Sequence, residues 1–189
     1  MASRLNLRFQ TAPRQFLEKT VLFSDELTSP EATALMRHRI AHHIDIQPLK
    51  ERSTARVLSS LHLYADTPLT AYFVPPSGST IIAREEPPYR FVFFPEFNGA
   101  RLLVRTEGEN WLRLDCEQNL GGRVPEPESP YCDSFAYWDH TGGDLVGRIR
   151  ATLVLVKETG HPWSAIMQQI VGTPGFEVVR RVFARRLRY

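Results

Sequence analysis

The sequence contains few cysteines and no long apolar run. Its two cysteines, Cys116 and Cys132, are too few for a disulfide scaffold or a cysteine-rich zinc cluster, although one bridge between them stays open. No apolar run reaches the length of a membrane-spanning helix, and Met1–Gln10 lacks the apolar core of a signal peptide. We therefore expect a cytoplasmic protein, with signal-free secretion into a host or target cell as the alternative.

The net charge is also small, and it is unevenly distributed. The 189 residues include 23 lysines and arginines against 21 acidic residues, a formal charge of +2. The segment Phe176–Tyr189 contains five arginines and one glutamate, a net +4, so the rest of the chain sums to −2. A composition this close to neutral argues against a broad nucleic-acid-binding face. The basic charge is concentrated in one C-terminal segment.

This C-terminal segment separates into two faces when it is placed on a helical wheel at about 100° per residue. The apolar face consists of Phe176, Val178, Val179, Val182, Phe183 and Leu187. The opposite face carries Arg180, Arg181, Arg185 and Arg188, whereas Arg186 falls inside the apolar arc. Thr173-Pro174-Gly175 supplies a helix start signal. We predict a basic amphipathic helix that docks on the core.

The remaining pattern divides the chain into a helical, a strand-rich and a second helical region. Residues 67–140 contain short aromatic and β-branched runs bounded by proline and glycine, which is typical of antiparallel strands. The predicted strands are Thr70–Val74, Thr80–Arg84, Arg90–Phe94, Arg101–Arg105, Trp111–Asp115 and Ser134–Trp138, the fourth and fifth joined as a hairpin by a five-residue loop.

Residues 1–66 and 141–189 are predicted to be mostly helical. The expected N-terminal elements are a strand at Leu5–Phe9 and helices over 14–23, 29–44 and 50–64, the last with a strand from about Leu61 as an alternative. The expected C-terminal elements are a helix or strand over 144–157, a helix over 161–171 and the basic helix. The economical fold is a single α+β domain over 1–189, an antiparallel sheet of about five to six strands with flanking N- and C-terminal helices.

Cys132, Asp139 and His140 are the residue types of a thiol-dependent hydrolase. An imidazole beside a thiol lowers the pKa of the thiol, and a carboxylate orients the imidazole. Eight residues of extended strand place Cys132 and His140 more than about 20 Å apart, so catalysis requires a folded-back chain or another histidine, His62 or His161. A structural cysteine is the alternative interpretation.

Two further patterns suggest chemistry more weakly. His38 and His42 are four residues apart on the predicted helix 29–44, but Arg39 beside them opposes a cation, so we predict neither a metal site nor a cofactor. Glu107 and Glu109 form a Glu-x-Glu pair, which resembles the signature of ADP-ribosyltransferases. An acidic surface loop explains the same two residues.

A longer resemblance lies in the run Phe93–Leu103 followed by Trp111–Asp115. It is similar to the strand pair that carries the active site of cytotoxic-necrotizing-factor-type glutamine deamidase toxins, in which a small residue and a glycine precede the catalytic cysteine and a histidine follows on the next strand. Ala100 stands at the cysteine position, and Leu112 or Leu114 at the histidine position. The resemblance implies the fold of a secreted bacterial effector whose chemistry is absent or moved.

Three functions are consistent with these residues. We favour an interaction or effector-type domain that binds an acidic or protein partner, because arginine and aromatic side chains carry much of the binding energy of interfaces. Its expected binding residues are Arg180, Arg181, Arg185, Arg186, Arg188, Tyr131, Tyr137 and Trp138. The alternatives are a Cys-His hydrolase or deamidase of a bacterial toxin type, with Cys132 as nucleophile, and a nucleic-acid-binding domain that uses the arginines.

Overall fold

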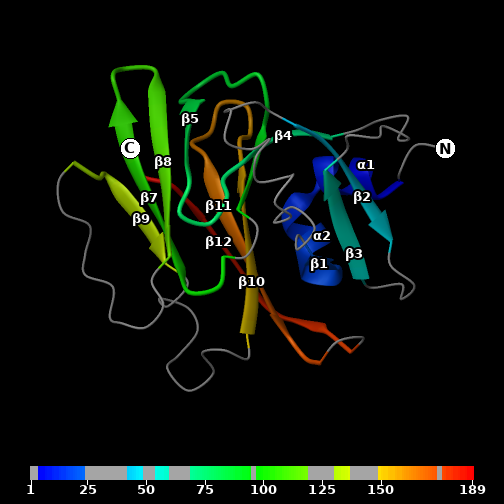
Figure 1. The fold of residues 1–189 in the computed structure, drawn as a ribbon. Helices are drawn as coiled ribbons and strands as arrows, with labels where there is room; N and C mark the ends of the chain where they lie inside the picture. The colour runs from blue at the N-terminus through cyan, green and yellow to red at the C-terminus, as the bar shows by residue number, and fades with distance from the viewer. Residues whose placement is uncertain are drawn as a thin grey trace.

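The computed structural model describes residues 4–23, 42–48, 54–59, 69–94, 97–118, 130–136, 149–173 and 176–189. These ranges contain two short helices and twelve strands (Figure 1). The elements are α1 (Arg4–Thr11), α2 (Pro13–Lys19), β1 (Val21–Phe23), β2 (His42–Pro48), β3 (Thr54–Ser59), β4 (Leu69–Phe73), β5 (Ser79–Ala83), β6 (Phe91–Phe94), β7 (Ala100–Glu107), β8 (Trp111–Gln118), β9 (Asp133–Ala136), β10 (Ile149–Val156), β11 (Ser164–Val171) and β12 (Val178–Arg186). The described part of the chain has no helix long and apolar enough to cross a membrane.

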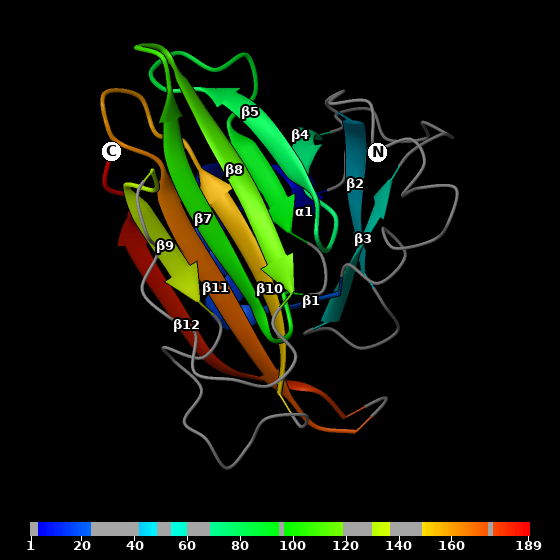
Figure 2. The same ribbon diagram turned by 60° about the vertical axis from the view of Figure 1, so that its left-hand side comes forward.

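The strands form two sheets that lie face to face (Figure 2). The larger sheet has eight strands in the order β1-β3-β2-β4-β6-β10-β11-β12, and the smaller has four in the order β5-β8-β7-β9. Pairing is antiparallel except between β1 and β3 and between β4 and β6. Both helices cover the face of the larger sheet that points away from the smaller one (Figure 1). The fold is broadly α+β, but it has more strands than predicted and two sheets in place of one.

The central strands of the larger sheet are buried on both faces. In β6, Val92 and Phe94 pack between the two sheets, whereas Phe91 and Phe93 pack beneath the helices. Strand β10 alternates in the same way between the two cores. A strand that is covered on both sides needs apolar residues at every position. This requirement explains the unbroken runs Phe91–Phe94 and Leu153–Val156.

Gln168 of β11 connects the helical layer to the larger sheet through side-chain hydrogen bonds. Its side chain is fully buried, and Oε1 accepts a hydrogen bond of 2.9 Å from the backbone N–H of Leu22. Its Nε2 donates to the carbonyl groups of Leu17 and Thr20. A buried amide is tolerated when its polar atoms are paired, so this network fixes where α2 and β1 meet the sheet.

Asp133 of β9 and Arg185 of β12 join the edges of the two sheets. The Arg185 guanidinium donates to both carboxylate oxygens, at 2.7 and 3.0 Å, and also to the carbonyl group of Ser134. The backbone N–H of Arg188 donates to the same carboxylate at 2.9 Å. The guanidinium lies 5.3 Å from the ring centroid of Phe135. Because the Asp133 side chain is only 10% exposed, this pairing is largely shielded from water.

The predicted basic C-terminal helix is wrong, because Val178–Arg186 is strand β12. Gln169 pairs with Arg181 and Ile170 with Val179, so Arg180 is the extra residue of a β-bulge. Beyond the bulge, Phe183 and Arg185 point between the sheets, whereas Val182 points to the helical layer. The β-branched residues that fit one helix face also favour a strand, and pairing with β11 decided the outcome.

Other predicted helices are also strands. Ser164–Val171 is β11 rather than part of a helix, and Thr54–Ser59 is β3 within the range predicted as helix 50–64. For residues 144–157 the strand alternative is confirmed at Ile149–Val156. Helix 29–44 is wrong at its end, where His42 begins β2, and its earlier residues lie outside the described ranges. The opposite error occurs at Leu5–Phe9, which lies in α1.

The strands predicted in the strand-rich region are present, but β4 and β6 pair in parallel rather than antiparallel. The runs around 70–74, 80–84 and 90–94 correspond to β4, β5 and β6, and Ser134 lies in β9. The predicted hairpin is formed by β7 and β8, but its loop is the three residues 108–110 rather than five. Gly108 has φ of 68°, a conformation that glycine adopts without steric strain.

Removal of the carboxylate that joins the sheets should destabilise the fold. We expect Asp133→Ala to lower the free energy of unfolding by about 2–4 kcal/mol, because Arg185 and the Arg188 N–H both lose their acceptor. Arg188→Ala is the matched control, since it keeps the backbone N–H, and it should cost less than about 0.5 kcal/mol. Urea denaturation measures both. Equal losses in the two variants would show that the ion pair does not join the sheets.

The buried amide gives a second stability prediction. Gln168→Leu keeps the side-chain size but leaves three backbone groups near α2 and β1 without their partner, so we expect a loss of about 2–4 kcal/mol. The same replacement at Gln15, which is exposed on α2, should change stability by less than about 0.5 kcal/mol. Thermal unfolding of the two variants checks this, and a similar effect at both positions would contradict the assigned role of Gln168.

Candidate functional site

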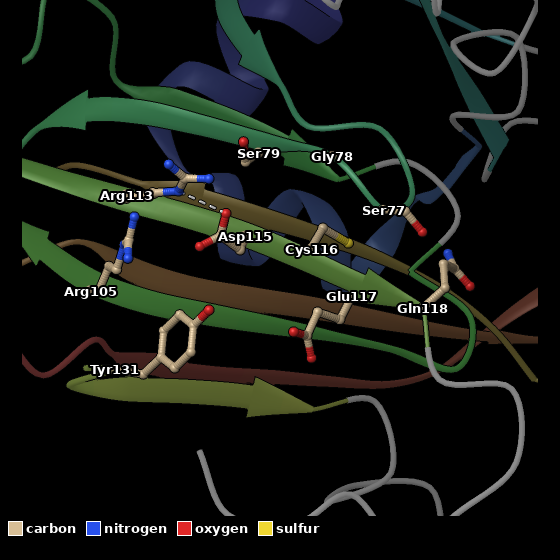
Figure 3. A pocket seen from close by; sticks show the side chains of 10 residues that line it. All are labelled: Ser77, Gly78, Ser79, Arg105, Arg113, Asp115, Cys116, Glu117, Gln118 and Tyr131. Carbon is tan, nitrogen blue, oxygen red and sulfur yellow. Dashed lines mark hydrogen bonds and ion pairs between the residues drawn. The ribbon is translucent and has the colours of Figure 1, made fainter. Parts of the chain in front are cut away.

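A polar groove of about 570 Å³ lies on the outer face of the four-stranded sheet (Figure 3). Its floor is formed by strands β5, β7 and β8, by the turn before β5 and by Tyr131, which directly precedes Cys132. The lining residues are Ser77, Gly78, Ser79, Arg105, Arg113, Asp115, Cys116, Glu117, Gln118 and Tyr131. Figure 3 shows Arg105, Arg113 and Tyr131 at one end of the groove and Gln118 at the other.

The strand period places charged side chains on this outer face. In β8, Leu112, Leu114 and Cys116 are buried between the sheets. The alternate positions, Arg113 and Asp115 among them, therefore point outward. Strand β7 contributes Arg101 and Arg105 in the same way, since Leu102 and Val104 are buried. The four-stranded sheet therefore has one buried and one solvent-exposed face, and the groove lies on the solvent-exposed face.

Arg105 and Arg113 stand directly opposite each other on β7 and β8. Arg113 Nε donates to Asp115 Oδ1 at 3.0 Å, and this hydrogen bond raises the pKa of Arg113. Arg105 lies 3.4 Å from Glu107, and its buried Nε has no hydrogen-bond partner among the described residues. Like charges directly across a sheet destabilise the pair. The arrangement therefore places two guanidinium groups side by side, each paired with one carboxylate.

The turn before β5 sets the other end of the groove. The carbonyl group of Gly78 accepts a hydrogen bond of 2.8 Å from the backbone N–H of Cys116. A side chain at Gly78 would lie 2.7 Å from the ring of Pro75, so only glycine fits without movement. Ser77 has φ of 57°, the left-handed region that non-glycine residues seldom adopt. The turn thereby presents two serines at the rim of the groove.

Cys132 does not have the surroundings of an activated nucleophile. Its Sγ donates to the carbonyl group of Val104 at 3.2 Å, and within the described ranges it contacts no histidine. Burial raises the pKa of the Cys132 thiol above its ordinary value, with the charge of Asp133 acting in the same direction. The other cysteine is more strongly affected, since burial raises the pKa of Cys116 to about 12. Both cysteines are free, so the disulfide that was left open does not form.

The other candidate residues have varied positions. Arg180, Arg181, Arg186 and Arg188 are exposed at β12 and after it, whereas Arg185 is bound to Asp133. Asp139, His140, Tyr137 and Trp138 lie outside the described residues, as do His38 and His62. His161 is exposed.

The residues that the structure describes contain no group of three or more histidine, cysteine or acidic side chains that could hold a metal ion. His42 is in a strand, so the helical spacing to His38 does not apply.

No protein-family model matches the chain, and a search of curated proteins found no match. The resemblance to deamidase toxins therefore stays a prediction. In the structure, Ala100, Leu112 and Leu114 are all fully buried, and they pack between the two sheets. Glu107, one half of the Glu-x-Glu pair, ends β7 and faces Arg105. Ala100, Leu112 and Leu114 are therefore core residues, whereas Glu107 lies at the surface.

Sequence reasoning named Tyr131 as a binding residue but missed the rest of the groove, including its two arginines. The available signal was the alternation Trp111-x-Arg113-x-Asp115-x-Glu117, which places a polar or aromatic residue at every second position of a predicted strand. Arg105 required in addition the register of the hairpin, which depends on the loop length.

The two thiols give a test of the catalytic alternative. Since a raised pKa leaves less thiolate near neutral pH, we expect iodoacetamide to modify Cys132 more slowly than a free cysteine peptide at about pH 7, with the rate still rising above about pH 9. Cys116 should react only after unfolding. Mass spectrometry of each cysteine across a pH series measures this. A Cys132 rate that levels off below about pH 8 would instead indicate an activated thiolate.

Proposed function

We propose that the chain is an interaction domain that binds a protein partner on the outer face of its four-stranded sheet. The observation that carries this proposal is the cross-strand pair of Arg105 and Arg113 at the end of an open groove. An acidic side chain of the partner would lie against the two guanidinium groups. It would accept charge-assisted hydrogen bonds, which are stronger than neutral ones.

Aromatic residues support the same surface. Trp111 is 50% exposed, and it follows the outward alternation of Arg113 along β8. Tyr131 lines the groove beside Arg105 (Figure 3). Tryptophan, tyrosine and arginine are the residues that most often dominate binding energy at protein interfaces. A large exposed aromatic ring next to a polar groove is therefore better explained by a partner surface than by folding.

The balance of charge favours a protein over a nucleic acid. Arg101, Arg105 and Arg113 are each paired with a carboxylate on this face. The carboxylates belong to Glu117, Glu107 and Asp115 respectively. A continuous phosphate backbone would pass over these three negative groups, whereas nucleic-acid sites present extended positive surfaces. A single acidic side chain avoids that repulsion.

Substitutions on this face should reduce partner binding without unfolding the domain. We expect Arg105→Ala and Trp111→Ala each to deplete a captured partner about tenfold or more, measured by quantitative mass spectrometry of proteins retained on the immobilised chain. Leu7→Ala is the control, since Leu7 is 63% exposed on α1, away from this sheet. The affinity of the purified partner for each variant then gives the dissociation constants.

Two results would contradict the proposal. One is retention of the same proteins by the wild-type chain, Arg105→Ala and Trp111→Ala when all three have the same melting temperature. The other is a loss of partner processing in Cys132→Ser with binding unchanged, which would favour the hydrolase alternative. A partner that stays intact when it is incubated with the wild-type chain, and that binds Cys132→Ser equally tightly, supports an interaction domain.

A further inference from the structure

Strand β12 forms one end of the larger sheet (Figure 2). In the part of the chain that the structure describes, it pairs with β11 alone, over Val178–Arg186. Nine residues make a long edge strand. An edge strand presents a row of N–H and C=O groups that another strand can pair with, so natural proteins either protect such edges or use them for binding.

The direction of the backbone groups follows from the pairing with β11. The N–H of Leu187 donates to the carbonyl group of Trp163 at 2.7 Å, so Leu187 directs its backbone toward β11. Antiparallel ladders alternate between residues that face the neighbouring strand and residues that face away. Because Leu187 faces β11, the residue before it, Arg186, faces away, and so do Ala184 and Val182. These three residues direct their N–H and C=O groups to the open edge.

One end of this edge is already closed by side chains. Arg185 donates to the carbonyl group of Arg186 at 3.1 Å, and Asp133 accepts from the N–H of Arg188 at 2.9 Å. Val182 and Ala184 make no comparable hydrogen bond at the edge among the described residues. The protection therefore stops at Arg186. Two consecutive outward positions, Val182 and Ala184, thus have no hydrogen-bonded strand beside them among the described residues, which is enough for one hydrogen-bonded step of an added strand.

Positive charge surrounds these open positions. Arg180 and Arg186 are exposed, and neither forms an ion pair with another described residue. Arg181 is exposed too, with its guanidinium 4.7 Å from the ring centroid of Phe183. This charge repels the β12 edge of a second copy of the chain, which disfavours self-pairing. It attracts an extended segment that carries carboxylates.

We propose that β12 receives an extended acidic segment of a protein partner, which adds as a further strand along Val182–Ala184. The backbone groups of these residues provide hydrogen bonds, and the arginines on either side select acidic side chains. Two exposed apolar residues extend the surface: Val178, the first residue of β12, is 57% exposed, and Phe176, two residues before the strand, is 79% exposed. This proposal does not depend on the groove, which lies on the other sheet.

The experiment uses the full chain and a synthetic eight-residue peptide of alternating glutamate and valine, with a lysine and valine peptide of equal length as the control probe. Ala184→Pro removes the outward N–H but not a hydrogen bond to β11, so it should weaken binding of the acidic peptide about tenfold or more. Ala184→Val keeps the N–H and should bind as the wild-type chain does. Fluorescence anisotropy measures the affinities, and circular dichroism verifies folding of each variant.

Hydrogen exchange on the unaltered chain provides a second measurement, in case Ala184→Pro does not fold. Bound acidic peptide should slow exchange of the Val182 and Ala184 amides by about tenfold or more, and the lysine peptide should not. The proposal is overturned if these amides stay unprotected at saturating peptide. It is also overturned if Arg186→Glu abolishes binding whereas Ala184→Pro does not, because the contact is then electrostatic only. Mutual protection of β12 in a dimer would assign the edge to a second copy instead.

Discussion

The ion pair between Asp133 and Arg185 joins the edges of the two sheets, which share one apolar core. Strand β9 is four residues long, and it lies at the edge of the smaller sheet. A strand this short gains little from pairing with β7 alone. Asp133 connects it to β12 through the two terminal nitrogens of the Arg185 guanidinium, and it also accepts from the N–H of Arg188. Cys132, which directly precedes β9, is in addition held to β7 by hydrogen bonds from its N–H and its Sγ to the carbonyl group of Val104.

The same connection explains why the C-terminal arginines do not act as one group. Arg185 is turned inward and carries a fixed carboxylate partner, whereas Arg180, Arg181 and Arg186 remain at the surface. One arginine of the basic C-terminal segment therefore stabilises the fold, and three others make one sheet edge positively charged. The polar groove draws its charge from β7 and β8, which contain arginine and carboxylate in equal measure.

The sequence predicted the local elements better than the nonlocal ones. The β7–β8 hairpin was found because alternation, turn residues and pairing all lie within twenty residues. Strand β12 was predicted as a helix because a bulge at Arg180 interrupts the strand alternation of its residues. With that interruption, its valines and arginines fit the period of a helix as well as that of a strand. Arg186, which fell on the wrong side of the helical wheel, was the sign of the error. The groove was missed for a related reason: a five-residue loop would place Arg105 opposite Trp111, whereas the actual three-residue loop places it opposite Arg113.

The bond between Gln168 and Leu22 spans 146 residues of chain, and this separation affects how the molecule is built during synthesis. The two helices leave the ribosome well before β11, which carries their anchoring amide. Until then the apolar side chains Phe9, Phe16 and Leu17 have no complete sheet to cover. Contacts this distant in sequence form slowly. The nascent chain therefore passes through a stage with an exposed apolar N-terminal segment, the kind of segment that chaperones recognise.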